Sequence, residues 1–483
     1  MTTATGAALR RIQLGNALSA FGNGFTVPFT FVYVAQVRGL GAGVAGAVLA
    51  TFAVAALVVL PFTGRAIDRR GPVPVAVAGT VLAAAGSLGL GLSGQELVVI
   101  AAAGVLGAGI AVVQPALATM IVWCSTTATR SRAFAMQFFL NNVGLGVGGL
   151  LGGLIVDTAH PSSFIRLFAI ESAMFLVLGA VVATTRLAVP SAPAIGLVRE
   201  VEGLQADGGV GSREQEIGAR EARDAARAGG GLRVMAGDRA MVMVCVLGFV
   251  MFFACYGQFE SGLSAYAVEV TRISPATLGA ALAANTAMIV AAQFLVLRIV
   301  ERRRRSRVIA AVGLVWSVAW LAAGASGLVH GSHALAVAAI ISTYALFGLG
   351  ESMLAPTVNP LVADLAPERM VGQYNAAFAL VKQLALALGP AVAGLVAAAG
   401  VYPAYIVMLV VCSLLISAVA LRMARHLSAE QDSPHRARVV AVAVRPVVET
   451  GTAGAVVPEP AAREGREPAV GAHGTAAAEC VCC

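Results

Sequence analysis

Twelve apolar segments follow one another along this chain, and each is about 20 residues long or longer. A helix rises about 1.5 Å per residue, so each segment can cross the roughly 30 Å hydrocarbon core of a bilayer. Open sheet edges do not survive in hydrocarbon, so the sequence predicts an all-α integral membrane protein with twelve transmembrane helices. We place the segments at 12–37, 43–63, 72–93, 97–123, 133–157, 163–186, 239–268, 275–299, 306–328, 334–363, 371–400 and 402–424.

Charge is scarce and unevenly placed along the chain. Hydrophobic residues make up 58% of the 483 residues and charged residues only 12%, which excludes an ordinary soluble protein. Arginines supply the net charge of +8, and they lie in alternate loops, at Arg65, Arg69, Arg70, Arg130 and in the run 302–305. Because positively charged loops stay in the cytoplasm, we predict a multi-pass protein of the plasma (inner) membrane with both termini cytoplasmic. The arginines form no single patch, so we expect no nucleic-acid partner.

The second half of the chain repeats the first. At an offset of about 241 residues, two stretches of the first half match two of the second. The matched ranges are 148–153 with 389–394 and 109–115 with 350–356, and at a slightly shorter offset Tyr33 and Gly46 match Tyr266 and Gly279. Two copies of a multi-helix unit in one membrane chain are typical of secondary transporters, which bind their substrate between the halves. Transport is therefore the first functional hypothesis.

The repeat and the polar intervals divide the chain into four parts. We predict an N-terminal six-helix bundle at 1–186, a cytoplasmic linker at 187–238, a C-terminal six-helix bundle at 239–425 and a disordered cytoplasmic tail at 426–483. The linker loses hydrophobicity and gains Gly, Ala and alternating charge. The tail is rich in Ala, Val, Pro, Glu and Arg and lacks helical periodicity.

The loop between the second and third segments reads Gly64-Arg65-Ala66-Ile67-Asp68-Arg69-Arg70-Gly71. It resembles the signature loop of the major facilitator superfamily, G-x-x-x-D-R-x-G, at Gly64, Asp68, Arg69 and Gly71. Asp68 can pair with nearby arginines or cap a helix N-terminus across the interface between the halves. Such a contact exists in only one gate state, so we predict a gating loop; the alternative is a basic loop that only sets topology. In the second half the equivalent loop keeps an acid, Glu301, before its arginines.

Small residues are concentrated on the fifth and eleventh segments. The fifth resembles the antiporter signature of the same family, G-x-x-x-G-P-x-x-G-G, with Gly149 in place of the proline, and the eleventh restores the Gly-Pro pair. Proline or paired glycine weakens a helix so that it can bend during gating, and the alternative is close helix packing. The predicted helix-bending positions are Gly144, Gly148, Gly149, Gly152, Gly153, Pro356, Gly389 and Pro390.

Three ionisable residues lie inside apolar segments of the second half: Glu260, Glu351 and Lys382. A charge at membrane depth costs at least about 2.5 to 3.5 kcal/mol unless it is paired or hydrated. Lys382 is the only lysine of the chain, and helix rise places it at a depth similar to that of Glu351. We predict that these two form a pair, either a structural salt bridge or a switch that responds to substrate or protons. Glu260 is predicted to be a cavity carboxylate.

Neutral polar residues at membrane depth are further candidates for substrate or proton contacts. We expect about half of the intramembrane amides to face a cavity and the others to serve packing. The candidates are Asn23, Gln114, Asn141, Asn142, Gln258 and Asn285, and Gln293 and Asn359 are further amides at membrane depth.

The resemblance covers residues 10–425 and implies the major facilitator fold, two pseudo-symmetric six-helix bundles, in the 12-span drug:proton antiporter-like branch. It implies a secondary active transporter that works by alternating access. We predict proton-coupled efflux of small amphipathic organic compounds. An uptake symporter for a nutrient or metabolite is the alternative, although aromatic residues amount to only 6%, which disfavours a sugar carrier. A non-transporting membrane receptor or scaffold is an alternative of another class.

Other classes of function lack their motifs. The chain has no G-x-x-x-x-G-K-[ST] phosphate loop, and its six histidines lie outside the middle of the segments. We therefore expect neither an enzyme nor a cofactor or metal site. The expected partners are a small-molecule substrate, protons and the lipid bilayer, with the chain acting as a monomer.

Overall fold

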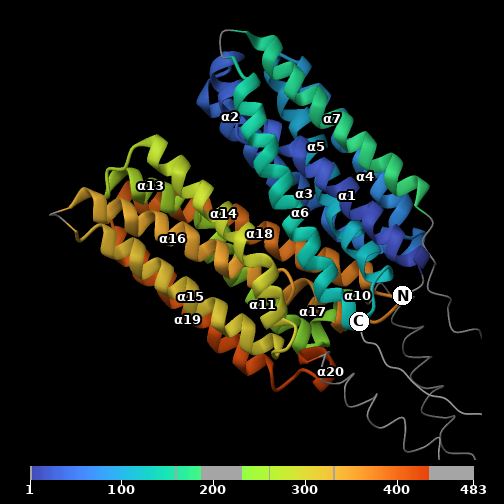
Figure 1. The fold of residues 1–483 in the computed structure, drawn as a ribbon. Coiled ribbons are helices and arrows are strands. Elements are labelled where there is room, and N and C mark those ends of the chain that lie inside the picture. Colours follow the sequence, from blue (N-terminus) through green and yellow to red (C-terminus); the bar gives the residue numbers. More distant parts are fainter. Residues whose placement is uncertain (1–2, 158–159, 186–230, 260, 330–331, 434–483) are drawn as a thin grey trace, which may run out of the picture. The chain divides into compact units, whose positions relative to one another are not determined.

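The computed structural model describes residues 3–157, 160–185, 231–259, 261–329 and 332–433, and in these ranges the regular structure is helical (Figure 1). Eleven helices are long and apolar enough to cross a membrane, and a twelfth span results if the bent pair Gly6–Thr26 and Thr30–Val37, which meet at 42°, is one span. The described helices all lie in one compact unit. The predicted all-α membrane architecture is confirmed.

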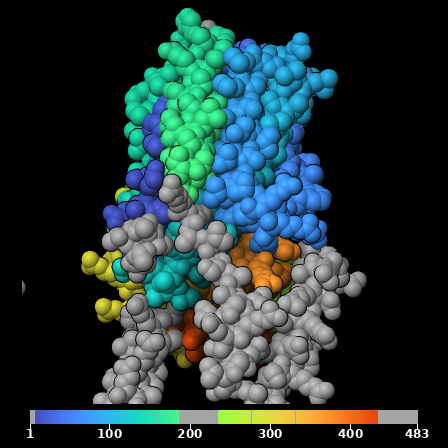
Figure 2. Space-filling model, turned by 90° about the vertical axis from the view of Figure 1, so that its right-hand side faces the viewer, coloured from blue at the N-terminus to red at the C-terminus, as the bar shows by residue number. Residues whose placement is uncertain are grey.

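The N-terminal bundle contains the first six spans. Its first span is α1 (Thr3–Thr26), α2 (Thr30–Val32) and a π-helix, η1 (Tyr33–Val37). The others are α3 (Gly41–Arg70), α4 (Pro72–Leu92), α5 (Glu96–Trp123), α6 (Thr127–Ile155) and α7 (Pro161–Thr184). Helix α1 packs against α6 and α7, and α5 packs against α3 and α4. Figure 2 shows the outer surface of this bundle, where α4 and α7 lie side by side.

The C-terminal bundle contains six further spans. Its first span is α11 (Arg239–Met251), the π-helix η2 (Phe252–Tyr256), α12 (Gly257–Phe259) and α13 (Gly262–Glu269), preceded by the short α10 (Gly231–Gly237). The tenth span of the chain is broken between α16 (His333–Leu354) and α17 (Val358–Leu365), a break that contains Pro356. The remaining helices are α14 (Pro275–Val300), α15 (Arg305–Ser326), α18 (Val371–Ala399), α19 (Tyr402–Met423) and α20 (Ala429–Asp432).

The ordered chain extends beyond residue 425, where we predicted the disordered tail to begin. Ser428 and Gln431 form a capping box at the start of α20, and the Asp432 carboxylate accepts hydrogen bonds from the Ser306 backbone N–H at 2.8 Å and its hydroxyl at 3.0 Å. The end of α20 is therefore fixed to the first turn of α15. The rest of the predicted tail, 434–483, and most of the predicted linker, 186–230, lie outside the described residues.

Large aromatic side chains fill the interior of the C-terminal bundle. Apolar side chains are exposed on the outer surface of the protein. Trp316, Trp320 and Phe347 are fully buried, and the Trp320 indole N–H donates to the Ala254 carbonyl at 3.2 Å. On the outside, Leu150 and Leu154 are 70% and 78% exposed. Such exposure is unfavourable in water and suits hydrocarbon.

The sequence repeat corresponds to a repeated hydrogen bond. The Tyr33 hydroxyl donates to the Gly91 carbonyl at 2.5 Å, and the Tyr266 hydroxyl donates to the Gly324 carbonyl at 3.3 Å. Tyr33 and Tyr266 are matched in the sequence, and Gly324 follows Gly91 at that same shorter offset. Each bond joins the first and third spans of its bundle, so the two bundles share internal architecture as well as sequence.

Close glycine contacts are also repeated between the first and fifth spans of each bundle. A Cβ atom on Gly24 would lie 2.9 Å from Gly148 Cα, and one on Gly389 would lie 2.6 Å from Gly257 Cα. Real Cβ atoms do not approach other carbons so closely, so these positions let two backbones pack directly. Both α6 and α18 run unbroken through their glycine clusters. Packing thus accounts for Gly148 and Gly389, and helix bending at the cluster positions stays a prediction.

The close contact at Gly389 predicts a stability difference between two alanine variants of α18. Gly389→Ala forces α12 and α18 apart and should destabilise the protein by about 1–3 kcal/mol. Gly394→Ala, on the same helix, adds a methyl group where nothing lies within 4 Å, so it should leave stability unchanged or raise it slightly. Thermal unfolding of the full chain in detergent measures both. Equal melting temperatures for the two variants would contradict this packing.

Candidate functional site

The two bundles meet through helix pairs that the repeat relates to each other. Helix α3 packs against α18 and α6 against α14, with α5 and α17 adding contacts. Because α3 and α14 are second spans and α6 and α18 are fifth spans of their bundles, each pair joins a second span to a fifth. We define the basic face as the end that carries the arginine-bearing loops 70–72, 300–305 and 365–371, together with loop 123–127, which Arg130 of α6 follows, and the opposite face as the other end.

At the basic face Asp68 caps a helix of the other bundle. Its carboxylate accepts hydrogen bonds from the backbone N–H groups of Gly372, at 2.7 Å, and Gln373, at 3.1 Å, in the first turn of α18. Of the two partners considered from the sequence, arginine or a helix N-terminus, the structure therefore has the helix N-terminus. Gly64 permits the approach, since a Cβ there would lie 2.7 Å from Gln373 Cα, and Gly71 ends α3 at φ 84°.

The equivalent acid of the second bundle makes the equivalent contact. Glu301 accepts a hydrogen bond from Arg132 of α6 at 3.0 Å. Arg132 and Gln373 hold matching positions near the starts of the two fifth spans. Both acids at the basic ends of the second spans thus bind the beginning of a fifth span in the other bundle. Arg69 of the signature loop is exposed and joins none of the ion pairs found among the described residues.

A third contact at the basic face is a buried ionic cluster that sequence reasoning missed. Asp364 at the end of α17 binds Arg130 of α6 and Arg305 of α15, the latter at 2.6 Å. Asp364 and Arg305 have side chains that are only 3% exposed, and Arg305 also donates to the Gln431 carbonyl at 2.9 Å. Helix α20 and the bundle interface are thereby connected. Within the described ranges, every hydrogen bond and ion pair that joins the bundles lies at their basic-face ends.

Between the bundles lies a cavity of about 640 Å³ that both of them line. Of the predicted site residues, seven reach it: Asn23, Gln114, Asn141, Asn142, Glu351, Asn359 and Lys382. Three others do not line it. Gln258 binds the Gly389 carbonyl and the Tyr405 hydroxyl, Asn285 binds Glu351 and the Tyr344 carbonyl, and Gln293 donates to the Ser352 carbonyl. Glu260 lies outside the described residues. Sequence reasoning missed the lining residues Asn16, Gln137, Asn375, Gln383, Phe52, Phe134, Phe138, Phe252, Tyr256 and Phe378.

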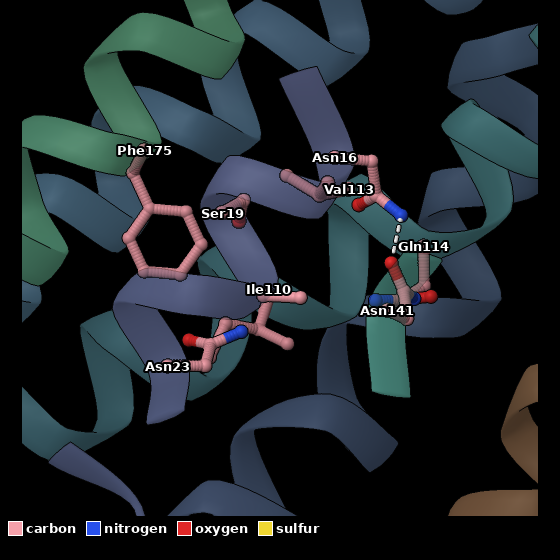
Figure 3. A pocket seen from close by; sticks show the side chains of 9 residues that line it. Asn16, Ser19, Asn23, Ile110, Val113, Gln114, Asn141 and Phe175 are labelled. Carbon is pink, nitrogen blue, oxygen red and sulfur yellow. Dashed lines mark hydrogen bonds between the residues drawn. The ribbon is translucent and has the colours of Figure 1, made fainter. Parts of the chain in front are cut away.

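The wall formed by the N-terminal bundle is neutral and rich in amides. Figure 3 shows Asn16 of α1 donating to the Asn141 side-chain oxygen of α6 at 2.7 Å, with Gln114 of α5 beside them and Asn23 farther along α1. A side pocket of about 30 Å³ opens among these amides, with room for a water molecule. Among the described residues, the buried oxygens of Asn23 and Gln137 have no hydrogen-bond partner. The exposed amide of Gln114 offers this wall's donor and acceptor groups to a bound molecule.

The wall formed by the C-terminal bundle carries the charge. Glu351 is 7% exposed and accepts a hydrogen bond from Asn285 at 3.2 Å. Lys382 is exposed to the cavity, and its Nζ lies 5.0 Å from the centroid of the Phe252 ring. Both residues of the predicted pair line the cavity, but the four ion pairs found among the described residues do not join them.

The repeat aligns these two walls position by position. At the offset of the fourth and fifth spans, Ile110 matches Glu351 and Asn141 matches Lys382. At the shorter offset of the first spans, Asn23 matches Tyr256. The charged residues Glu351 and Lys382 of the C-terminal bundle thus occupy the positions that uncharged residues occupy in the N-terminal bundle.

Comparisons with known proteins agree with this architecture. The sequence profile of the Major Facilitator Superfamily matches residues 13–342 and 263–461. No curated protein matches the sequence significantly. The fold is similar to that of the human organic anion transporter MFSD10 (TETRAN), with a TM-score of 0.62, 16% identity, and coverage of 88% of this chain and 99% of that one.

Two further solved structures show the same fold at low sequence identity. The proton:xylose symporter XylE, bound to 6-bromo-6-deoxy-D-glucose, has a TM-score of 0.65 and 13% identity, and the match covers 88% of this chain and 95% of that one. A bacterial homologue of the iron transporter ferroportin, in an outward-facing state, has a TM-score of 0.64 and 14% identity, with coverage of 86% and 99%. The profile match covers most of the sequence. The chain therefore belongs to the Major Facilitator Superfamily, a family of membrane transporters and not of enzymes.

Proposed function

We propose that this chain is a secondary active transporter that works by alternating access and exports small amphipathic organic compounds in exchange for protons. The carrying observation is a cavity walled by both bundles, combined with cross-bundle polar contacts confined to the basic face. A volume of about 640 Å³ lies in the range of cavities that hold drug-sized molecules. Apolar walls with a few polar groups suit an amphipathic ligand.

The orientation follows from the arginines. Because positively charged loops remain in the cytoplasm, we place the basic face, and with it both termini, on the cytoplasmic side. In this orientation the described conformation has its cytoplasmic gate closed and would load or release substrate at the outer side. The opposite state requires the basic-face contacts to break.

The contacts that close the basic face contribute different amounts of free energy to the closed state. A hydrogen bond to a charged group contributes about 1.5–3 kcal/mol, so the Asp68 cap is a substantial part of closure. The Arg132 side chain is 67% exposed, so its pair with Glu301 contributes only about 0–1 kcal/mol. A ligand that binds the two states with affinities differing by about 10⁴-fold shifts their equilibrium from 1:99 to 99:1. A difference in affinity of this order would be enough to favour the state that is open at the basic face.

Glu351 is the proposed proton-coupling group among the described residues. It is an acid at the cavity wall, its equivalent in the other bundle is the apolar Ile110, and its neighbours Asn285 and Tyr256 can bind either of its charge states. The fourth span has no arginine for this task. Protons that reach Glu351 through the cavity would change the charge beside the substrate, which couples the two fluxes.

Uptake by symport remains the alternative function, and a structural observation removes one argument against it. The low aromatic content disfavoured a sugar carrier, yet six aromatic side chains gather at the cavity: Phe52, Phe134, Phe138, Phe252, Tyr256 and Phe378. Proteins of this fold include both the proton:xylose symporter XylE and the organic anion transporter MFSD10. Direction must therefore be measured, and binding without flux would indicate the receptor alternative.

The gate predicts how Asp68→Asn changes the distance between the bundles. Loss of the charged cap should raise the population open at the basic face about tenfold, since about 1.4 kcal/mol is one decade. Pulsed electron–electron spin resonance between labels at positions 127 and 302, in a cysteine-free background, should show a larger long-distance fraction. Arg69→Gln, which removes an exposed charge of the same loop, is the matched control. Identical distance distributions for Asp68→Asn and wild type would refute this gate.

The coupling proposal predicts compound-dependent proton movement. In inside-out vesicles with an acidic interior, a transported compound should dissipate the gradient, as reported by a pH-sensitive dye. Glu351→Gln should reduce the rate of gradient dissipation at least about tenfold, because an amide side chain cannot take up and release a proton as a carboxylate does. Glu96→Gln, an exposed acid at the start of α5, should behave as wild type.

Two outcomes of this assay count against the proposal. Substrate flux without proton movement would remove proton coupling, and proton movement that is unchanged in Glu351→Gln would remove Glu351 from it. Movement of substrate only in the same direction as the protons would indicate symport, and so the uptake alternative.

A further inference from the structure

The charge that the cavity offers to a ligand is positive. Among the described residues that line it, the charged ones are Glu351 and Lys382. The Glu351 side chain is almost completely buried and accepts a hydrogen bond from Asn285. Lys382 is exposed to the cavity and is in none of the ion pairs found in the described ranges. The two charges are therefore presented unequally, and the ammonium is the one that a ligand meets.

An ammonium at membrane depth is stabilised when an anion binds it. Its neighbour is the face of the Phe252 ring, a cation–π contact that contributes about 0.5–2 kcal/mol, and within the described part of the chain no hydrogen bond of Nζ is found. A lysine ammonium has three N–H donors and no acceptor. A carboxylate is the common organic group that supplies both the opposite charge and the acceptors.

The remaining lining residues describe the rest of the ligand. Phe252 and Phe378 on one wall and Phe52 and Phe138 on the other provide apolar and aromatic surface. The neutral amides of the N-terminal bundle, among them the exposed Gln114 with Asn16 and Asn142, line the same cavity as the charged wall. The oxygens of these cavity-lining amides accept hydrogen bonds and would repel a second anionic group.

We propose that the cavity binds an organic acid: a carboxylate at Lys382, an apolar or aromatic body along the phenylalanines, and a neutral hydrogen-bonding end at the amide wall. This names the substrate class of the proposed transporter and rests on that function for its physiological meaning. The ligand touches both bundles, with its charge held by the C-terminal one. Its binding to the cavity does not depend on proton coupling or on direction.

The single lysine makes binding measurable at one atom. Purified full-length protein in detergent is treated with a small amine-acetylating reagent, and the fraction of acetylated Lys382 is read by peptide mass spectrometry. Naphthalene-2-carboxylate or benzoate should slow acetylation about tenfold when present at about ten times its dissociation constant. The uncharged naphthalene-2-carboxamide and the cation 2-naphthylmethylammonium should slow it less than about twofold.

Variants then test the role of the charge by calorimetric titration with naphthalene-2-carboxylate. Lys382→Gln should weaken binding by about 10- to 100-fold, the range expected for a lost hydrogen-bonded ion pair, and Lys382→Arg should keep it within about threefold. Arg298→Gln removes an exposed positive charge from α14, away from the cavity, and should bind as wild type.

Three results would overturn the proposal: no protection of Lys382 by either acid at about 10 mM, equal protection by the cation, or unchanged acid affinity in Lys382→Gln. The protection assay needs only wild-type protein, so a variant that fails to fold does not affect it. Acid binding at Lys382 without any flux would leave this site standing and remove the transport proposal. Flux of cations without acid binding would do the reverse.

Discussion

The rest of the structure depends on a carboxylate of one bundle that caps a helix of the other. Asp68 accepts two backbone N–H groups at the start of α18, where unsatisfied donors and the helix dipole favour a negative charge. Because both N–H groups belong to the backbone of the other bundle, the cap is lost when the bundles move apart at this face. Glu301 with Arg132 and the Asp364 cluster reinforce it at the same face. Together they close one end of a cavity that neither bundle could form alone.

Duplication gives the two bundles the same skeleton but different chemistry at the cavity. The Tyr33 and Tyr266 hydrogen bonds and the two glycine contacts occupy matching positions, so packing inside each bundle has kept the repeat. At the cavity, by contrast, the position that Asn141 holds in the first bundle is held in the second by Lys382, the only lysine of the chain. Symmetric packing supports the rocking of two similar bodies, and an asymmetric charge allows one of them to respond to a ligand or a proton.

Much of the fold followed from the sequence because its determinants are local. Apolar length defines the spans, and the break at Pro356 and the turn at Gly71 come from residues with restricted or unusual backbone angles. For Asp68 the sequence left two partners open, an arginine or a helix N-terminus, and the structure has the helix N-terminus.

The site was less predictable, because these helices are apolar on every side and periodicity does not indicate which face meets the cavity. Gln258 and Asn285 were candidates by depth alone, and both turned out to hold neighbouring helices or Glu351 in place. Asn16 was missed although it lies on α1 two turns from Asn23. The Asp364 cluster was missed because its members come from three separate helices, and only tertiary packing brings them together.

The most direct test of alternating access is the reactivity of Lys382 from each side of the membrane. A membrane-impermeant amine-reactive reagent is applied to right-side-out and to inside-out vesicles, and the Lys382 peptide is quantified by mass spectrometry. The account predicts modification from both sides, with Asp68→Asn accelerating modification from the basic face and slowing it from the opposite face. Modification from one side only, unchanged in Asp68→Asn, would contradict a cavity that alternates between the two faces.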